Sequence, residues 1–149
     1  MSHTQLEADY LIVGSGAVGM AFADTLLDET DANIVIVDKF PKPGGHWNVA
    51  YPFVSLHQPS AFYGVSSREL SKGQFDQIGL NKGLGELATG AEVSVYFDEV
   101  MRHKFLTSGR VQYFPMCEYS NDGKFESMTT GQSYTVTVKK KTIDATFLK

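Results

Sequence analysis

The sequence predicts an α/β domain built around a parallel β-sheet, and two observations lead to this fold class. A short hydrophobic run, Tyr10–Val13, ends at a glycine, as a strand buried on both faces does. Hydrophobic residues then recur at helical spacing over residues 20–27, and a second, β-branched run follows at Ile34–Val37. Strand, glycine turn, helix and strand within about 30 residues form a βαβ unit with a right-handed crossover.

Length and composition predict one domain that covers residues 1–149. Of these residues, 42% are hydrophobic and 20% are charged, which is typical of a folded globular chain. The net charge of −4, without a basic run longer than Lys139–Lys141, argues against a nucleic-acid or membrane-surface binder. The single cysteine, Cys117, excludes an internal disulfide and a multi-cysteine zinc site, and the polar N-terminus is no secretory signal. We therefore expect a cytoplasmic domain.

The rest of the chain is predicted to contain one more helix and a series of strands. Thr89 and Glu92 have the spacing of a capping box, and the helix that they begin is expected to end at Ser108–Gly109. An exposed connection is expected over 71–85. A strand is expected over 110–119, and a second over 124–129 that pairs with it across a turn. An alternating strand from Tyr134, a solvated turn at the three lysines and a last strand over 142–148 follow.

The strongest chemical signal is the spacing of three glycines between the first strand and the first helix. The segment reads Gly14-Ser15-Gly16-Ala17-Val18-Gly19. In a dinucleotide-binding turn, the first glycine permits the tight turn, the second admits the pyrophosphate, and the third allows close packing of helix and strand. The N-terminus of the helix then directs free amides at the phosphates. The strand–turn–helix context makes this motif much more specific than the glycine spacing alone.

An acidic residue stands where a dinucleotide-binding domain carries its ribose ligand. Asp38 follows the second strand, 19 positions after Gly19, and its carboxylate can accept hydrogen bonds from ribose hydroxyls. Its negative charge also repels a 2′-phosphate, which favours FAD or NAD over NADP. The adjacent Lys39 works in the opposite direction, because a basic neighbour tolerates a phosphate.

A second glycine-rich segment, Pro43-Gly44-Gly45-His46-Trp47, follows Asp38 closely. A double glycine lets the backbone pass close to a ligand. Together with the first motif, this segment resembles the N-terminal FAD-binding domain of FAD/NAD(P)-dependent oxidoreductases, and it is most similar to flavin-containing monooxygenases. The resemblance spans about residues 8–149, with its specific motifs in the first 50. A proline–glycine turn with a buried Trp47 is the simpler alternative.

This resemblance implies a three-layer Rossmann-like fold, in which a parallel sheet carries helices on one face and a β-meander on the other. It implies that Gly44, Gly45, His46 and Trp47 line the pyrophosphate and ribityl part of FAD. His57 and Gln58 are then expected near the flavin ring, although His46 and His57 also fit ordinary loop histidines. Met116, in the segment 114–117, is expected to contact the adenine through its backbone. The segment 144–146 resembles the end of the strand that closes such domains, with Phe147 in place of the usual glycine.

Other chemistries have weaker support in the sequence. The four histidines have no metal-ligand spacing, no Gly-x-Ser-x-Gly elbow occurs, and Cys117 lacks a partner for disulfide reduction. The predicted function is therefore the FAD-binding part of a monooxygenase-like oxidoreductase, with an unknown small-molecule substrate and without an assigned catalytic residue. NADPH or NADH is expected to reduce the full-length enzyme. Because no second nucleotide-binding motif follows, we expect a missing C-terminal domain or partner chain and weak activity of this chain alone.

Two other function classes remain open from the residues. One is an NAD-binding dehydrogenase module, which the double glycine after Asp38 disfavours. The other is a non-enzymatic binding module on the flavoprotein fold, against which the complete glycine motif argues.

Overall fold

A computed structural model describes residues 3–44, 65 and 90–146 of the chain. The elements run in the order β1 (His3–Val13), α1 (Ala17–Glu29), β2 (Ile34–Val37), α2 (Gly90–Val100), β3 (Val111–Phe114), β4 (Cys117–Asn121), β5 (Lys124–Ser127) and β6 (Ser133–Asp144). One π-helical turn, η3 (Met101–Phe105), and one 3₁₀ turn, η4 (Leu106–Ser108), extend α2. Gly109 ends this helix in the left-handed conformation, with φ of 74°, as its sequence predicts.

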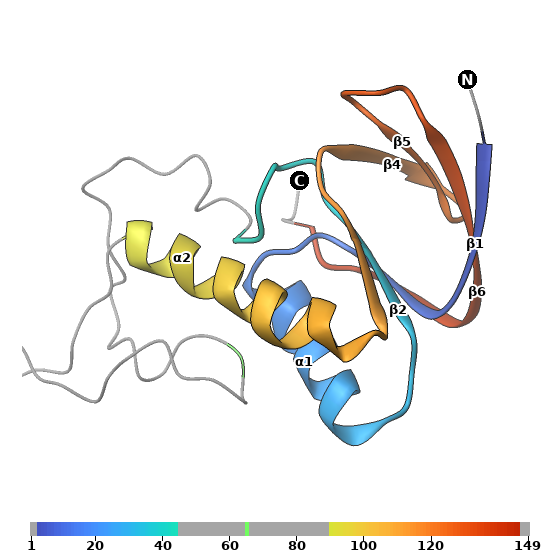
Figure 1. The fold of residues 1–149 in the computed structure, drawn as a ribbon. Helices are drawn as coiled ribbons and strands as arrows, with labels where there is room; N and C mark the ends of the chain where they lie inside the picture. The colour runs from blue at the N-terminus through green and yellow to red at the C-terminus, as the bar shows by residue number, and fades with distance from the viewer. Residues whose placement is uncertain (1–2, 45–64, 66–89, 147–149) are drawn as a thin grey trace, which may run out of the picture.

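The strands form one six-stranded sheet in the order β3-β2-β1-β6-β5-β4. Strands β3, β2, β1 and β6 are parallel, whereas β5 and β4 are antiparallel to their neighbours. The predicted βαβ unit is therefore present, and β1 lies at the centre of the parallel part with β2 on one side and β6 on the other (Figure 1). The parallel sheet with helices and a meander confirms the expected fold class.

The fold has three layers, and a hydrophobic core lies on each face of the sheet between it and an outer layer. On one face, Ile12, Ile34 and Ile36 contact buried residues of α1, α2 and η3, among them Met20 and Phe97. The core on the other face joins the strands to the meander and consists of Ala8, Leu11, Val13, Val35, Val37, Cys117, Phe125 and Val136. Because neighbouring residues of a strand point to opposite faces, β2 and the end of β1 are hydrophobic throughout, as the sequence predicts.

An ion pair fastens the extension of α2 to α1. The Lys104 ammonium of η3 lies 2.6 Å from Oδ1 of Asp24 and 2.8 Å from Oδ1 of Asp28. Asp24 is fully buried, so its charge needs this partner. Burial lowers the pKa of Lys104, but the bonds to both aspartates outweigh it and raise the pKa above its ordinary value. The two helices lie side by side in Figure 1.

The structure corrects three details of the predicted strands. Residues 110–119 do not form one strand, because Pro115 and Met116, which has φ of 56°, separate β3 from β4. The lysines at 139–141 form no turn, since β6 continues through them to Asp144. β1 also begins earlier than residue 10, with alternating exposed and half-buried side chains from His3 to Glu7.

The predicted capping box of Thr89 and Glu92 and the predicted connection over 71–85 lie outside the described residues or side chains. Among the described residues, no helix has the length and hydrophobicity needed to cross a membrane.

Candidate functional site

The glycine turn lies at the carboxyl ends of the parallel strands and is held there by backbone contacts. The Gly14 amide donates to the Val37 carbonyl oxygen at 2.8 Å, which ties the turn to the end of β2. Gly14 has φ of 109°, a conformation that side chains rarely adopt. A Cβ at this position would lie 2.9 Å from the carbonyl oxygen of Ala145, just after β6. The turn therefore has strands on both sides, and Gly14 is required both for its backbone conformation and for close contact.

Gly19 brings α1 directly against this turn. A Cβ at Gly19 would lie 2.1 Å from the Gly14 carbonyl oxygen, so no side chain fits between helix and turn. α1 begins at Ala17, and its first intrahelical bond runs from the Met20 amide to the Gly16 carbonyl oxygen at 2.9 Å. No side chain caps the N-terminus of α1, and its first turn has no acidic residue. The free amides and the positive end of the helix dipole are thus available to an anion.

Asp38 is bound to the glycine turn by Ser15. The Ser15 amide donates to Asp38 Oδ2 at 2.8 Å, and the Ser15 hydroxyl donates to the same oxygen. The Phe40 amide donates to the other carboxylate oxygen, Oδ1, at 3.2 Å. Ser15 has no exposed surface and Asp38 is only 7% exposed. Because a carboxylate accepts about four hydrogen bonds, these three leave room for about one donor from a ligand.

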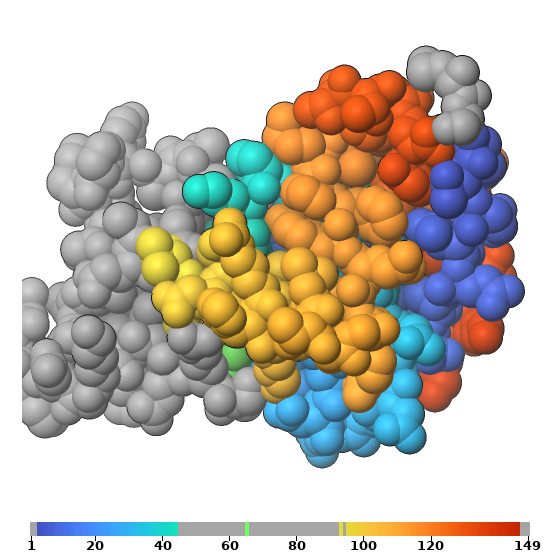
Figure 2. Space-filling view, viewed as in Figure 1, coloured from blue at the N-terminus to red at the C-terminus, as the bar shows by residue number. Residues whose placement is uncertain are grey.

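The second glycine segment reaches the same turn at its first glycine. Gly44 is buried, has φ of 123°, and donates its amide to the Ser15 carbonyl oxygen at 2.8 Å. Lys39 is exposed, and its ammonium lies 5.5 Å from the centre of the Phe40 ring, a cation–π contact. Figure 2 shows the exposed part of the segment after β2, in blue-green, at the surface of the molecule. The structure therefore brings Gly44 to the turn and gives Lys39 an aromatic neighbour.

Met116 lies next to this segment, and both of its backbone groups are already bonded. Its amide donates to the Phe40 carbonyl oxygen at 3.1 Å, and its carbonyl oxygen accepts the Met128 amide at 2.8 Å. The expected adenine contact at Met116 is thus limited to the side chain and to the second lone pair of the carbonyl, and it stays a prediction.

The other predicted contacts fall on residues that the structure does not describe. Gly45, His46, Trp47, His57, Gln58 and Phe147 all lie outside the described ranges. One residue near the site had no signal in the sequence: Tyr113 of β3, whose hydroxyl is buried beside Ser15 and Asp38. A tyrosine in a short strand is indistinguishable from ordinary core by pattern alone.

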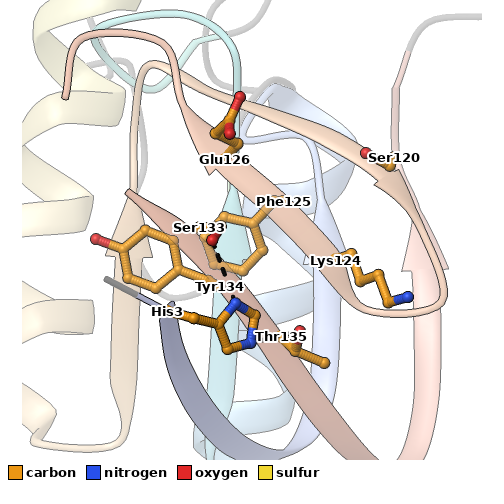
Figure 3. A pocket seen from close by; sticks show the side chains of 8 residues that line it. All are labelled: His3, Ser120, Lys124, Phe125, Glu126, Ser133, Tyr134 and Thr135. Atoms are coloured by element: carbon orange, nitrogen blue, oxygen red, sulfur yellow. Dashed lines mark hydrogen bonds between the residues drawn. The ribbon is translucent and has the colours of Figure 1, made fainter. Parts of the chain in front are cut away.

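A hollow in the surface lies at the opposite end of β1. Its floor consists of side chains from β1, β4, β5 and β6, namely His3, Ser120, Lys124, Phe125, Glu126, Ser133, Tyr134 and Thr135 (Figure 3). The His3 ring lies between two hydroxyls, at 3.2 Å from Ser133 Oγ and 3.0 Å from Thr135 Oγ1. His3, at one edge of this hollow, is separated from the glycine turn by the length of β1, roughly 30 Å. The Tyr134 ring, at another edge, lies 4.9 Å from the ring of Phe114, the last residue of β3. None of the predicted site residues lines the hollow.

The described residues contain no cluster of three His, Cys, Asp or Glu side chains that could hold a metal ion. The arrangement at the turn is instead a tight glycine backbone, an uncapped helix end and a buried carboxylate beside it. Such an arrangement can bind an anionic group and a neighbouring hydroxyl-bearing group.

Comparison with known proteins agrees with this fold. Residues 12–51 match the family described as the NAD(P)-binding Rossmann-like domain. An uncharacterized protein of Mycobacterium tuberculosis is 52% identical over 144 residues, which are 97% of this chain and 27% of that protein. The chain therefore spans about 27% of the length of this relative.

Solved structures share the fold at lower identity. A flavin-containing monooxygenase from Stenotrophomonas maltophilia has a TM-score of 0.63 and 18% identity, over 95% of this chain and 38% of that one. A cyclohexanone monooxygenase from Rhodococcus, bound to NADP+, has a TM-score of 0.53 and 22% identity, over 88% of this chain and 24% of that one. The predicted resemblance to flavin-containing monooxygenases is confirmed at the level of the fold.

Proposed function

We propose that this chain is the FAD-binding domain of a monooxygenase-like, flavin-dependent oxidoreductase. The observation that carries the proposal is the glycine turn. Gly19 lies so close to Gly14 that a Cβ on Gly19 would be 2.1 Å from the Gly14 carbonyl oxygen. α1 begins at this turn without a side-chain cap. This contact places the open N-terminus of α1 at the carboxyl ends of the strands, where α/β folds of this kind bind dinucleotides.

The residues present fit an FAD molecule. The amides of Ala17 and Val18, in the uncapped first turn of α1, would bind the pyrophosphate. Asp38 would accept one hydroxyl of the adenosine ribose with its remaining lone pair, while Ser15 and Phe40 hold its carboxylate in place. Gly44, which donates to the Ser15 carbonyl oxygen, would lie next to the pyrophosphate. FAD would supply the redox chemistry, and the chain would bind and orient it.

One argument disfavours NADP in this site, and a second favours FAD over NAD. The buried Asp38 charge disfavours a 2′-phosphate, and the Lys39 ammonium that could offset it lies over the Phe40 ring. The double glycine at residues 44 and 45 also fits a cofactor that runs along the segment after β2. NADPH or NADH would then act on the full-length enzyme as electron donor; the NADP+ bound to the Rhodococcus cyclohexanone monooxygenase supports this part of the proposal.

The rest of the predicted function concerns the protein beyond this chain. We infer that residues 1–149 are the N-terminal part of a longer flavoenzyme or need a partner chain, because the matched residues are only 27% of the M. tuberculosis relative. Alone, the chain is expected to bind FAD weakly and to catalyse little. A cytoplasmic location stays a prediction from the composition.

Titration of the purified chain with FAD tests the proposal. We expect binding, seen as a change in flavin fluorescence, and we expect ADP and NAD+ to compete better than NADP+, because Asp38 repels the 2′-phosphate. Binding of NAD+ without FAD would favour the dehydrogenase module. Failure of every dinucleotide to bind would favour a non-enzymatic module and contradict the proposal.

A further inference from the structure

The Tyr113 hydroxyl is a buried polar group without a hydrogen-bond partner in the described part of the chain. Tyr113 lies in β3 and pairs with Ile36 of β2, which is two residues before Asp38. Its side chain packs against the core on the helix side of the sheet. Buried hydroxyls in proteins nearly always have a partner, because an unmet one costs free energy. The lack of a partner therefore calls for a physical reason.

One polar side chain, Ser15, lies beside this hydroxyl without satisfying it, and the charges of two aspartates reach it. The Ser15 oxygen, whose proton is donated to Asp38, keeps lone pairs that could accept a bond. The two hydroxyls are, however, not in hydrogen-bond geometry. Burial is the main cause that raises the pKa of Tyr113 far above its ordinary value; the proximity of Ser15 offsets part of this rise, and the charges of Asp38 and Asp98 add to it. The Tyr113 hydroxyl thus keeps its proton at physiological pH and is a donor.

We propose that the Tyr113 hydroxyl is a ligand-binding donor that hydrogen-bonds the adenosine ribose of the bound dinucleotide. The inference rests on the proposed function and adds a residue to it. A ribose hydroxyl donates one hydrogen bond and accepts others, so it needs both an acceptor and a donor. Asp38 is the acceptor, with room left on its carboxylate. Tyr113 is the donor without a partner, and its hydroxyl lies within the field of the Asp38 charge.

The charges near Tyr113 favour a ribose over a phosphate at this point. Asp38 and Asp98 are the acidic groups whose fields reach the Tyr113 hydroxyl. A phosphate oxygen beside them would be repelled, whereas a neutral hydroxyl would not. The phosphates are better placed at the N-terminus of α1, whose first turn has no acidic side chain.

Substitution Tyr113→Phe, which removes only the hydroxyl, tests the inference. We expect the dissociation constant for FAD to rise about tenfold, the loss of one hydrogen bond. The melting temperature of the ligand-free protein should stay the same or rise, since the variant removes an unpaired buried group. Tyr134→Phe is the matched control, because Tyr134 packs against the core on the opposite face of the sheet from Tyr113, and should leave FAD affinity unchanged.

A second measurement identifies the part of the ligand involved. In the unchanged chain, 2′,3′-dideoxy-ADP should bind more weakly than ADP, and in Tyr113→Phe the ratio between them should shrink, because both changes remove the same hydrogen bond. A ratio that stays equal in both proteins would overturn the inference.

The two measurements distinguish a failure of the Tyr113 assignment from a failure of the proposed FAD-binding function. Unchanged FAD affinity in Tyr113→Phe, with or without a lower melting temperature, would show that the hydroxyl does not contact the ligand and would overturn the Tyr113 assignment alone. Failure of the unchanged chain to bind FAD or ADP would overturn the proposed function and the assignment with it.

Discussion

Gly19→Ala is expected to destabilise the protein by about 3 kcal/mol, although alanine is the better helix former. Gly19 lies in the first turn of α1, where propensity alone predicts a gain of about 1 kcal/mol. The added Cβ would lie 2.1 Å from the Gly14 carbonyl oxygen, a backbone atom that cannot move without displacing the turn. Helix and strand would have to separate. Urea unfolding followed by circular dichroism measures the free energy of unfolding.

Gly109→Ala is the control for this prediction. Gly109 has φ of 74°, and a Cβ there would meet nothing within 4 Å, so only backbone strain of about 1 kcal/mol opposes the change. Gly19→Ala should therefore be clearly less stable than Gly109→Ala. Equal or greater stability of Gly19→Ala than of the unchanged protein would show that α1 does not contact the turn in this way.

Gly16→Val is expected to weaken FAD binding about a hundredfold, a loss of about 2.7 kcal/mol, while the protein stays folded. Gly16 is the N-cap of α1, with φ of −77° and ψ of −169°, angles that L-amino acids adopt readily. The substitution thus costs about 1 kcal/mol of stability at most. Its side chain, however, would occupy the place where the pyrophosphate approaches the backbone. Calorimetric titration with FAD measures the loss.

Thr25→Val serves as its control, since it introduces the same side chain at an exposed position of α1 away from the turn. This variant should bind FAD as the unchanged protein does, and both variants should show the circular dichroism spectrum of a folded domain. FAD affinity that is equal in Gly16→Val and Thr25→Val would place the dinucleotide elsewhere.

The βαβ unit could be predicted because its signals are local. The glycines are spaced as they are because Gly14 needs a positive φ and because Gly19 packs directly against the Gly14 carbonyl oxygen. The hydrophobic runs of β1 and β2 follow from burial on both faces of the sheet. The acid after β2 was identified from its distance to the motif. Its three protein donors depend on how the turn folds over β2, and no sequence pattern reports this.

The errors in the strands have physical causes. Pro115 has no amide to donate and Met116 adopts a left-handed conformation, so the segment leaves β3 and crosses to the meander as β4. The proline inside the run was the available signal. β6 continues through its lysines because a β-bulge accommodates them: Ala8 of β1 pairs with Val138 and Tyr10 with Lys141, and the lysine side chains reach solvent. Lys139 also lies 3.6 Å from the Glu7 carboxylate, and the pairing of strands so distant in sequence cannot be read from local pattern.

The location of bound FAD on the chain tests the assigned site most directly. Amide chemical shifts in a ¹⁵N–¹H spectrum can be followed during titration with FAD. We expect the largest changes at Gly14–Met20 and around Asp38, and little change at residues of the hollow near His3 and Thr135. Changes concentrated at that hollow, or the absence of changes at the glycine turn when FAD is bound, would contradict the glycine turn as the dinucleotide site.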